Sequence, residues 1–524
     1  MRRRSLDSLP LRAAFAGLAL PLALAGCAVG PDFTKPAASV PEAWHGAGDQ
    51  RLALQPETDS QWWKSLADPT LDRLIELAYQ QNLPLQIAGL RILEARAQLG
   101  VATGQQFPQI QTVSGTAAYS GISANSPSYF PGLPRHFGDY QVGFDAAWEL
   151  DFWGKYRRGV ESEAAGLQAS VADYYAALVS LTAEVARTYV LIRTDQVLIA
   201  NTETNAQLQE ESFTIAQARF KNGATSELDP TQASTLLEST RATIPELQTG
   251  LTQAENALST LLGQPAGSAG ALLAGPKEIP KTPEKIAVAV PAEMLRRRPD
   301  IHSAELNAAA QCARVGVAKS DLYPSFSLFG TVGLETSTVN STTHNLFSSN
   351  SLFFAVGPRI SWPFFNYGRL RNGVRVQDAR FEELLVAYRN TVLRAVQEVE
   401  DALAGFLNAR ESMASQQKAV ASAQRAAEIA LAMYREGATD YQRVIDAQRS
   451  LLTQQNSLVQ ASSSVTTNLV ALYKALGGGW EARQGQPFVP ADLENEMRQR
   501  TNWGDLLTQP RKQEAAANPS SEKP

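Results

Sequence analysis

The sequence predicts a mixed fold in which a duplicated half-chain supplies both membrane β-strands and long α-helices. The first observation is a repeat: RFKNGAT at 219–225 returns as MYREGAT at 433–439, and FWGK at 152–155 returns as NYGR at 366–369, each 214 residues later. The second is a long helical composition in each half, and the third is a run of alternating apolar and polar residues before it. A period this long indicates a duplicated half-protein, since solenoid repeats span 20 to 50 residues.

The spacing of the repeat changes near the start of each half. Pro108 returns as Pro324, which is 216 residues later. The two-residue difference therefore arises between Pro108 and Phe152, where a loop of variable length would produce it.

The longest predicted helix lies in the first half. Residues 167–222 contain no glycine or proline and are rich in Ala, Leu, Gln and Glu. Extended back to Arg157, this helix has 66 residues and a length of ~99 Å. Its second copy runs from about 371 to 436, with Gly405 inside it.

A second helical stretch follows a glycine in each half. After Gly223 the stretch covers 226–262 and is expected to be interrupted at Pro245, and after Gly437 it covers 440–476 without a breaker. Each half is thus predicted to contain a helical hairpin with a tight tip at its glycine. The hairpins span 157–262 and 371–476.

The segments before the long helices predict β-hairpins that face lipid. Residues 140–151 alternate apolar and polar side chains over a length that suits a tilted membrane strand, and 354–364 repeat the pattern. Partner strands are expected at 109–121 and 325–336. The hairpins therefore span 109–151 and 325–365, joined internally by the polar loops 122–138 and 337–351.

Prolines and tryptophans refine these strands. Pro358 and Pro363 cannot donate a ladder hydrogen bond, so they predict a bulge or a strand end. Trp148 and Trp362 lie near strand ends, as expected for an interfacial aromatic girdle.

Four strands cannot close a barrel. An open apolar sheet in lipid would leave its edge groups unpaired, at several kcal/mol per group. Three chains would supply twelve strands, an even number within the range of outer-membrane barrels. The sequence therefore predicts a homotrimer that shares one 12-stranded barrel.

The N-terminus predicts export and lipidation. Residues 1–26 have a basic start and a short apolar stretch, as in a signal peptide. They end before Cys27 in a Leu-Ala-Gly-Cys run that resembles a bacterial lipobox. An ordinary signal peptide with a chance cysteine is the alternative.

Composition excludes several functional classes. Removal of 1–26 changes the formal net charge from −5 to −8, which argues against a nucleic-acid partner. The chain shows no P-loop, nucleophile elbow or GxGxxG. Its four histidines are scattered without metal-ligand spacing. The sequence predicts passage rather than catalysis, with no cofactor and no metal site.

The remaining segments complete the expected domain organisation. Segments 27–84, 264–299 and 478–524 are rich in Pro and Gly and are expected to form an equatorial belt, the last ending in a disordered tail. The two repeats span 85–263 and 300–477, and each begins with a helix.

Three motifs carry a family resemblance. They are CAVGPDF at 27–33, LRRRPDIHSAE at 295–305 and YREGATDYQRVIDAQRSLL at 434–452. With the duplication, they resemble the outer-membrane factors of bacterial tripartite efflux pumps, the OprM and TolC family, in its lipoprotein (NodT) branch. The resemblance implies a trimer with a 12-helix periplasmic tunnel below the barrel. It also implies docking onto a periplasmic adaptor and an inner-membrane RND transporter that supplies the energy.

Motif positions assign expected roles. Asp446 matches an acidic residue that rings the periplasmic constriction, with Arg443 and Gln442 beside it. Asp229 and Tyr434 match residues that bond helices together in the closed state, as a gate latch. The chain departs from the TolC pattern at Arg443, where a second acid is expected, and at Thr439, where a gating arginine is expected. Separately, the tips at Gly223 and Gly437 are expected to contact the adaptor, because glycine permits a tight reversal.

The main functional hypothesis is a passive outer-membrane exit duct for small toxic molecules. A duct for type I protein secretion is an alternative in the same class. An outer-membrane-anchored coiled-coil structural protein is an alternative in another class, against which the paired amphipathic hairpins count. The sequence does not specify the exported substrate.

Overall fold

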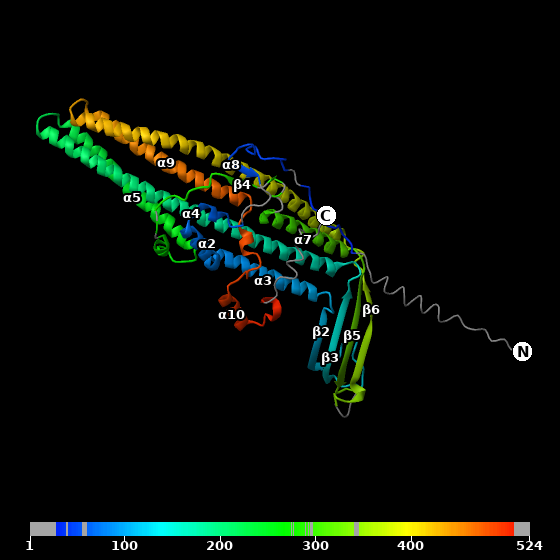
Figure 1. Cartoon of the computed structure of the whole chain (residues 1–524). Helices are drawn as coiled ribbons and strands as arrows, with labels where there is room; N and C mark the ends of the chain where they lie inside the picture. Colours follow the sequence, from blue (N-terminus) through cyan, green and yellow to red (C-terminus); the bar gives the residue numbers. More distant parts are fainter. Residues whose placement is uncertain are drawn as a thin grey trace. The chain divides into compact units, whose positions relative to one another are not determined.

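The computed structural model describes residues 28–507 except 38–39, 55–59, 274, 276, 289, 292, 294–296 and 340–344 (Figure 1). The signal peptide, Cys27, His344 and the tail beyond residue 507 lie outside the described residues. The chain divides into two units. The first contains 1–36, 94–169 and 305–387, and the second contains 37–93, 170–304 and 388–524.

The first unit contains a four-stranded antiparallel sheet. Its strands are β2 (Ile110–Gly121), β3 (His136–Leu150), β5 (Ser325–Ser337) and β6 (Leu352–Ser361), in the order β2-β3-β5-β6. Each β-hairpin is preceded by a 22-residue helix, α3 (Leu83–Gly104) or α7 (Pro299–Ser320). Within the described sheet, β2 and β6 each pair on one side, so the sheet has two open edges.

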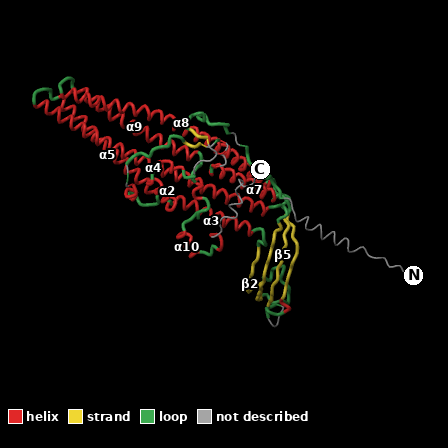
Figure 2. The backbone as a smooth tube through the Cα atoms, viewed as in Figure 1, coloured by secondary structure: helices red, strands yellow, loops and turns green. Residues whose placement is uncertain are grey.

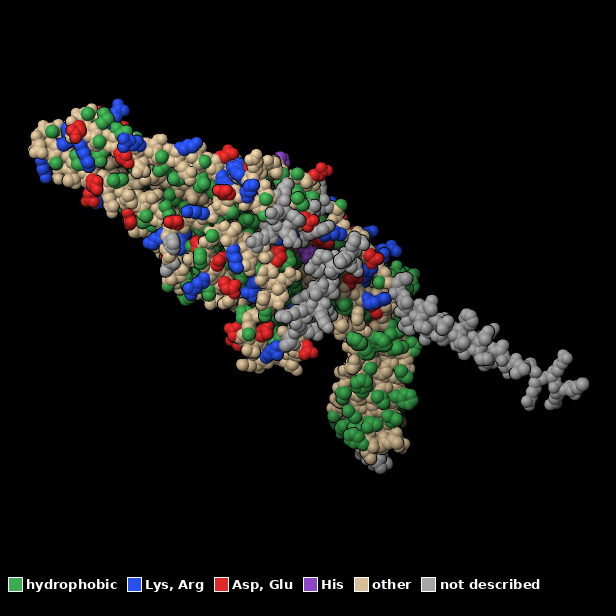
Figure 3. All heavy atoms as spheres, viewed as in Figure 1, with side chains coloured by type: hydrophobic (Ala, Val, Ile, Leu, Met, Phe, Trp, Pro, Cys, Tyr) green, Lys and Arg blue, Asp and Glu red, His purple; other side chains and the backbone are tan. Residues whose placement is uncertain are grey.

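The register places a row of large apolar residues, one from each strand, on one face. Val113 lies opposite Phe144, Phe144 opposite Val332, and Val332 opposite Phe354. These four side chains are 77%, 42%, 47% and 73% exposed. Figure 3 shows hydrophobic side chains gathered over the strands. A row of large apolar side chains left open to solvent is the pattern of a lipid-facing surface.

Two tryptophans are fixed at the strand ends. The indole of Trp148 donates to the carbonyl of Gln106 at 3.1 Å, and that of Trp362 donates to the carbonyl of Leu322 at 3.1 Å. Each ring remains partly exposed, with its polar N–H satisfied, as an interfacial tryptophan requires.

Two local expectations were wrong. Pro358 does not end or bulge the strand: it lies inside β6 opposite Leu328, in a strand that pairs on one side only, where a proline is tolerated. The strand end expected at Pro363 is confirmed, since β6 ends at Ser361. The helix after the first tip is not interrupted at Pro245: α5 runs without a break from Leu228 to Leu261. The missing N–H leaves the carbonyl of Arg241 without its helical donor; Arg241 and Pro245 are both exposed, so water can satisfy it.

The long helices are matched between the repeats (Figure 2). Helices α4 (Lys155–Lys221) and α8 (Arg369–Arg435) have 67 residues each, a length of ~100 Å. They run from the first unit into the second, where α5 and α9 (Tyr441–Ala475) follow them. By length and composition, α4 is the one described helix that could cross a membrane, but 61% of its apolar window is buried inside the protein.

The second unit also contains the Pro- and Gly-rich segments. The short strand β1 (Leu52–Leu54) pairs in parallel with β4 (Ile286–Val288). Arg298 of the RRPDI run is 7% exposed, and its guanidinium donates to Glu398 and to the carbonyl of Ala475, both at 2.7 to 2.8 Å. The smaller elements are α2 (Pro69–Gln81), α10 (Ala491–Arg500), η1 (Trp62–Leu66), η2 (Ser268–Leu273), η4 (Trp480–Arg483) and η5 (Gly504–Leu507), while η3 (Ser349–Ser351) precedes β6.

Candidate functional site at the helix tips

The two tips have the same backbone structure. Gly223 and Gly437 have φ of 72° and 77°, a conformation that strains any residue with a Cβ. The N–H of Gly223 donates to Phe220, as that of Gly437 donates to Tyr434. These bonds end α4 and α8 in the same way. The chain thus reverses direction at a glycine that occurs at the same place in both repeats.

Tyr434 lies at the centre of a cluster beside the tips. It is 1% exposed, and its hydroxyl donates to Oδ2 of Asp229 at 2.8 Å. Burial, followed by the neighbouring Asp229 carboxylate, raises the pKa of Tyr434 to about 12. The pair bonds α8 of the second repeat to α5 of the first. The residues matched to the gate latch are therefore in direct contact within one chain.

Arg219 is a third member that sequence reasoning missed. Its guanidinium lies 4.8 Å from the ring centroid of Tyr434 and donates to the carbonyls of Tyr434 and Arg435 at 2.6 and 3.0 Å. It thereby satisfies carbonyls at the end of α8 and places a cation over an aromatic face. Its place in the RFKNGAT motif was a signal, but its counterpart is Met433, so the repeat concealed its role.

Tyr441 extends the contact toward α4. Its ring packs edge-on against Tyr434 with centroids 5.0 Å apart, and its hydroxyl bonds to Ser212 at 2.7 Å. Burial raises its pKa, and the nearby Asp229 adds to this shift. We call the surrounding buried set the tip cluster: Ala216, Ala233, Leu236, Tyr434, Tyr441, Val444 and Ile445.

The three constriction candidates lie in the first turns of α9 and are exposed. Asp446 accepts a hydrogen bond from the side-chain amide of Gln442 at 3.0 Å. Arg443 donates its backbone N–H to Asp440, which caps the helix. Of the two residues expected beside Asp446, Gln442 is thus the one that bonds to it in the structure.

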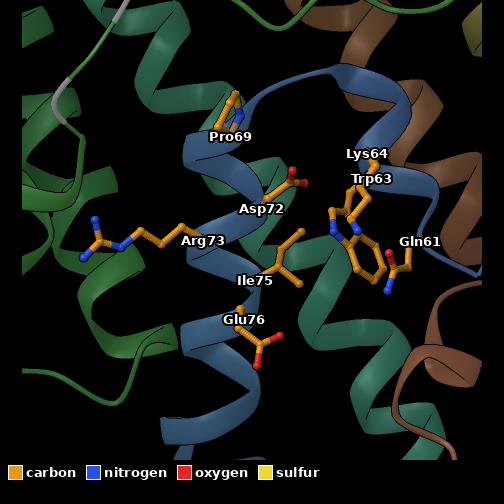
Figure 4. Close-up of a pocket in the computed structure, with 8 residues that line it drawn as sticks. All are labelled: Gln61, Trp63, Lys64, Pro69, Asp72, Arg73, Ile75 and Glu76. Carbon is orange, nitrogen blue, oxygen red and sulfur yellow. The ribbon is translucent and has the colours of Figure 1, made fainter.

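A pocket of the second unit lies apart from these residues. A pocket of about 450 Å³ lies between η1 and α2. Figure 4 shows Trp63 and Asp72 on one side of α2 and Arg73 extending away on the other. Burial raises the pKa of Asp72. No group of metal-ligating side chains occurs in the described part of the chain.

Comparison with known proteins agrees with this architecture. The family model "Outer membrane efflux protein" matches residues 74–264 and 290–478, once for each repeat. The probable outer membrane lipoprotein SilC of Salmonella typhimurium is 31% identical over 87% of this chain and 96% of its own. The solvent efflux pump outer membrane protein SrpC of Pseudomonas putida is 31% identical over 88% of this chain and 97% of its own.

A solved structure shares the fold. The outer-membrane channel OprN superimposes with a TM-score of 0.80 at 32% identity, covering 87% of this chain and all of the solved chain. The two family matches together cover more than half of the sequence, in step with the duplication. The chain therefore belongs to the outer membrane efflux protein family, whose members are homotrimeric outer-membrane channels that work with a periplasmic adaptor and an inner-membrane transporter and are not enzymes.

Proposed function

We propose that three copies of this chain form the exit duct for small toxic compounds that an RND-type transporter delivers. The four-stranded sheet carries the proposal, because it has an exposed apolar face and two open edges. Three such sheets joined edge to edge would pair all backbone groups and close a 12-stranded barrel. The likeness to a solvent efflux component favours small molecules over a secreted protein as cargo.

The periplasmic end of the duct is proposed to hold the gate. Tyr434 and Asp229 hold α8 to α5 in the closed state, and Arg219 reinforces them. Three copies of Asp446 would ring the constriction, with Gln442 and Arg443 on adjacent turns. Three carboxylates near one axis repel one another, so they would attract cations. The glycine tips, exposed in the single chain, are proposed to receive the adaptor.

The lipid anchor is proposed at Cys27, and the residues that follow it support this. The N–H of Val29 donates to the carbonyl of Trp153 at 2.9 Å, three residues beyond the end of β3. Asp32 accepts from the guanidinium of Arg158 at 2.6 Å. Gly30 packs against Gly316, where a Cβ would come within 2.5 Å of the backbone. The chain after Cys27 is thus fixed beside the end of a membrane strand, where an acyl chain could enter lipid. SilC is also described as a probable lipoprotein.

The anchor is tested by replacing Cys27 with Ser behind another signal peptide. We expect labelling by a fatty-acid probe to disappear, while some trimer still inserts, since one acyl chain gives only marginal membrane binding. The matched control is Cys312→Ser, because Cys312 is buried. Absence of label on the unmodified protein would refute the anchor.

The duct itself is tested in two ways. Purified trimers should form channels in planar bilayers, which a coiled-coil structural protein would not do. Deletion of the gene should sensitise cells to toxic small molecules and leave the set of secreted proteins unchanged. A deletion that abolishes secretion of one protein and leaves resistance intact would identify a type I secretion duct instead.

A further inference from the structure

The duplication assigns a counterpart to every residue of the latch. At an offset of 214, Asp229 corresponds to Arg443 and Tyr434 to Phe220. The same offset relates backbone hydrogen bonds, because Leu262 donates to Leu258 as Leu476 donates to Leu472. The counterparts therefore occupy equivalent places on equivalent helices. Two further pairs matter here: Tyr441 corresponds to Glu227, and Arg219 to Met433.

The counterparts of the buried latch are exposed in the single chain. Phe220 is 39% exposed and Met433 is 44% exposed, whereas Tyr434 is 1% exposed. Glu227 and Arg443 are also exposed. Two large apolar side chains and two opposite charges thus lie on equivalent helix ends. No residue that the structure describes covers them, whereas the tip cluster covers Tyr434.

A closed ring indicates what covers these faces. Within one chain, α5 of the first repeat packs against α8 of the second through Asp229 and Tyr434. In a ring of three duplicated chains the repeats alternate. In a ring that keeps the repeats equivalent, the second repeat of each chain would meet the first repeat of the next in the same manner, as a heterologous interface that closes. The equivalent contact joins α9 of one copy to α4 of its neighbour.

We propose that a second copy of this chain covers the exposed counterparts, with Arg443 of one copy packed on Phe220 and ion-paired with Glu227 of the next. The inference rests on the proposed trimeric duct. Phe220 takes the place of Tyr434, and Arg443 takes the place of Asp229. An arginine over a phenylalanine face is favourable, and the adjacent carboxylate supplies the opposite charge.

The ring then has two kinds of contact between helices. Three contacts within chains use a tyrosine, an acid and Arg219. Three contacts between chains use Arg443, Glu227 and Phe220. The contacts between chains rely on an ion pair, whereas the contacts within chains rely on a buried tyrosine, so salt should weaken the contacts between chains more.

Charge reversal tests the pair. Arg443→Glu places an acid opposite Glu227 of the neighbour, so closed-channel conductance should rise, by about two- to five-fold per contact. Arg443→Glu combined with Glu227→Arg should return it toward the wild-type value. The matched control combines Arg443→Glu with Glu203→Arg, which restores the same net charge farther along α4 and should not rescue closure. The inference would be overturned if Arg443→Glu with Glu227→Arg lowers conductance no more than Arg443→Glu with Glu203→Arg does.

Cross-linking separates this inference from the trimer itself. In a Cys312→Ser background, Arg443→Cys with Glu227→Cys should give linked dimers and trimers on a denaturing gel after a short thiol cross-linker. Asp229→Cys with Tyr434→Cys should give only a cross-link within one chain. Each variant with a single cysteine is the control for cross-links between two copies of the same cysteine. If native gels show trimers but Arg443→Cys with Glu227→Cys gives no link between chains, the proposed contact is wrong and the proposed trimeric duct is unaffected. If native gels show no trimer, the proposed function fails with it.

Discussion

The two helix tips have the same backbone and different side chains. Both glycines have positive φ, both helices end with matching hydrogen bonds, and both long helices have 67 residues. Around this common frame, the first repeat supplies Arg219 and Asp229 where the second supplies Met433 and Arg443. The difference teaches that duplication provided the geometry, while divergence of side chains decided how each contact is held.

The largest effect is expected where the shared backbone is broken. Gly437→Pro forces φ near −65° on a residue at 77°, at a cost of about 3 kcal/mol or more. Export should be lost because the tip can no longer receive the adaptor, while trimer abundance and barrel heat stability persist. Drug susceptibility measures export, and gel mobility measures the abundance and heat stability of the trimer.

A matched variant is Gly132→Pro. Gly132 also has positive φ, and it lies in the loop between β2 and β3, where nothing comes within 4 Å of a Cβ. Gly132→Pro should leave drug resistance unchanged. Normal resistance in Gly437→Pro would count against docking at the tips.

The second largest effect is expected at the latch. Tyr434→Phe with Asp229→Ala removes a hydrogen bond to a carboxylate, which contributes about 1.5–3 kcal/mol. Single-channel conductance in planar bilayers should rise. Tyr441→Phe removes a bond between two neutral hydroxyls and should have a smaller effect. Equal conductance of the double variant and the wild type would remove the latch assignment.

A pH series sharpens the same comparison. Burial raises the pKa of Tyr434 from 10.0 to about 12, so the proposed latch holds the phenol proton more tightly than an exposed phenol does. The stabilisation is complete below pH 10 and is lost as pH rises toward 12. Conductance should therefore increase over this range. In Tyr434→Phe the increase of conductance with pH should be smaller. An unchanged increase would mean that other tyrosines cause it.

The smallest effect is expected at the constriction. Asp446→Ala should mainly lower cation selectivity and block by multivalent cations added from the periplasmic side. Glu428→Ala removes the same charge from the exposed surface of α8 and serves as the control. If Asp446→Ala opens the pore and the latch variant does not, the two roles are exchanged.

Much of the fold could be predicted because its signals are periodic and occur twice. The fold class is confirmed, since the alternating strands and the long helices each occur in both repeats. The path through Pro245 could not be predicted, because it depends on whether the freed carbonyl faces water.

The contact between Asp229 and Tyr434 was expected only from a family resemblance. The role of Arg219 requires α4 and α8 to be placed side by side, so no local pattern reveals it. The same holds for Gln442, since either Gln442 or Arg443 can reach Asp446 from the preceding turn. Side-chain choice among helical neighbours is decided by packing, which sequence spacing does not specify.

The strand order has a consequence for biogenesis. Each β-hairpin is local, but β3 pairs with β5, so Asp139 must find Ser337 across an entire helical hairpin. Contacts between residues so distant in sequence form late, after the helices between them. Until then, the apolar rows of both hairpins are exposed in the periplasm and can aggregate. Assembly therefore depends on keeping two unfinished half-sheets apart from other chains until the second repeat has been exported.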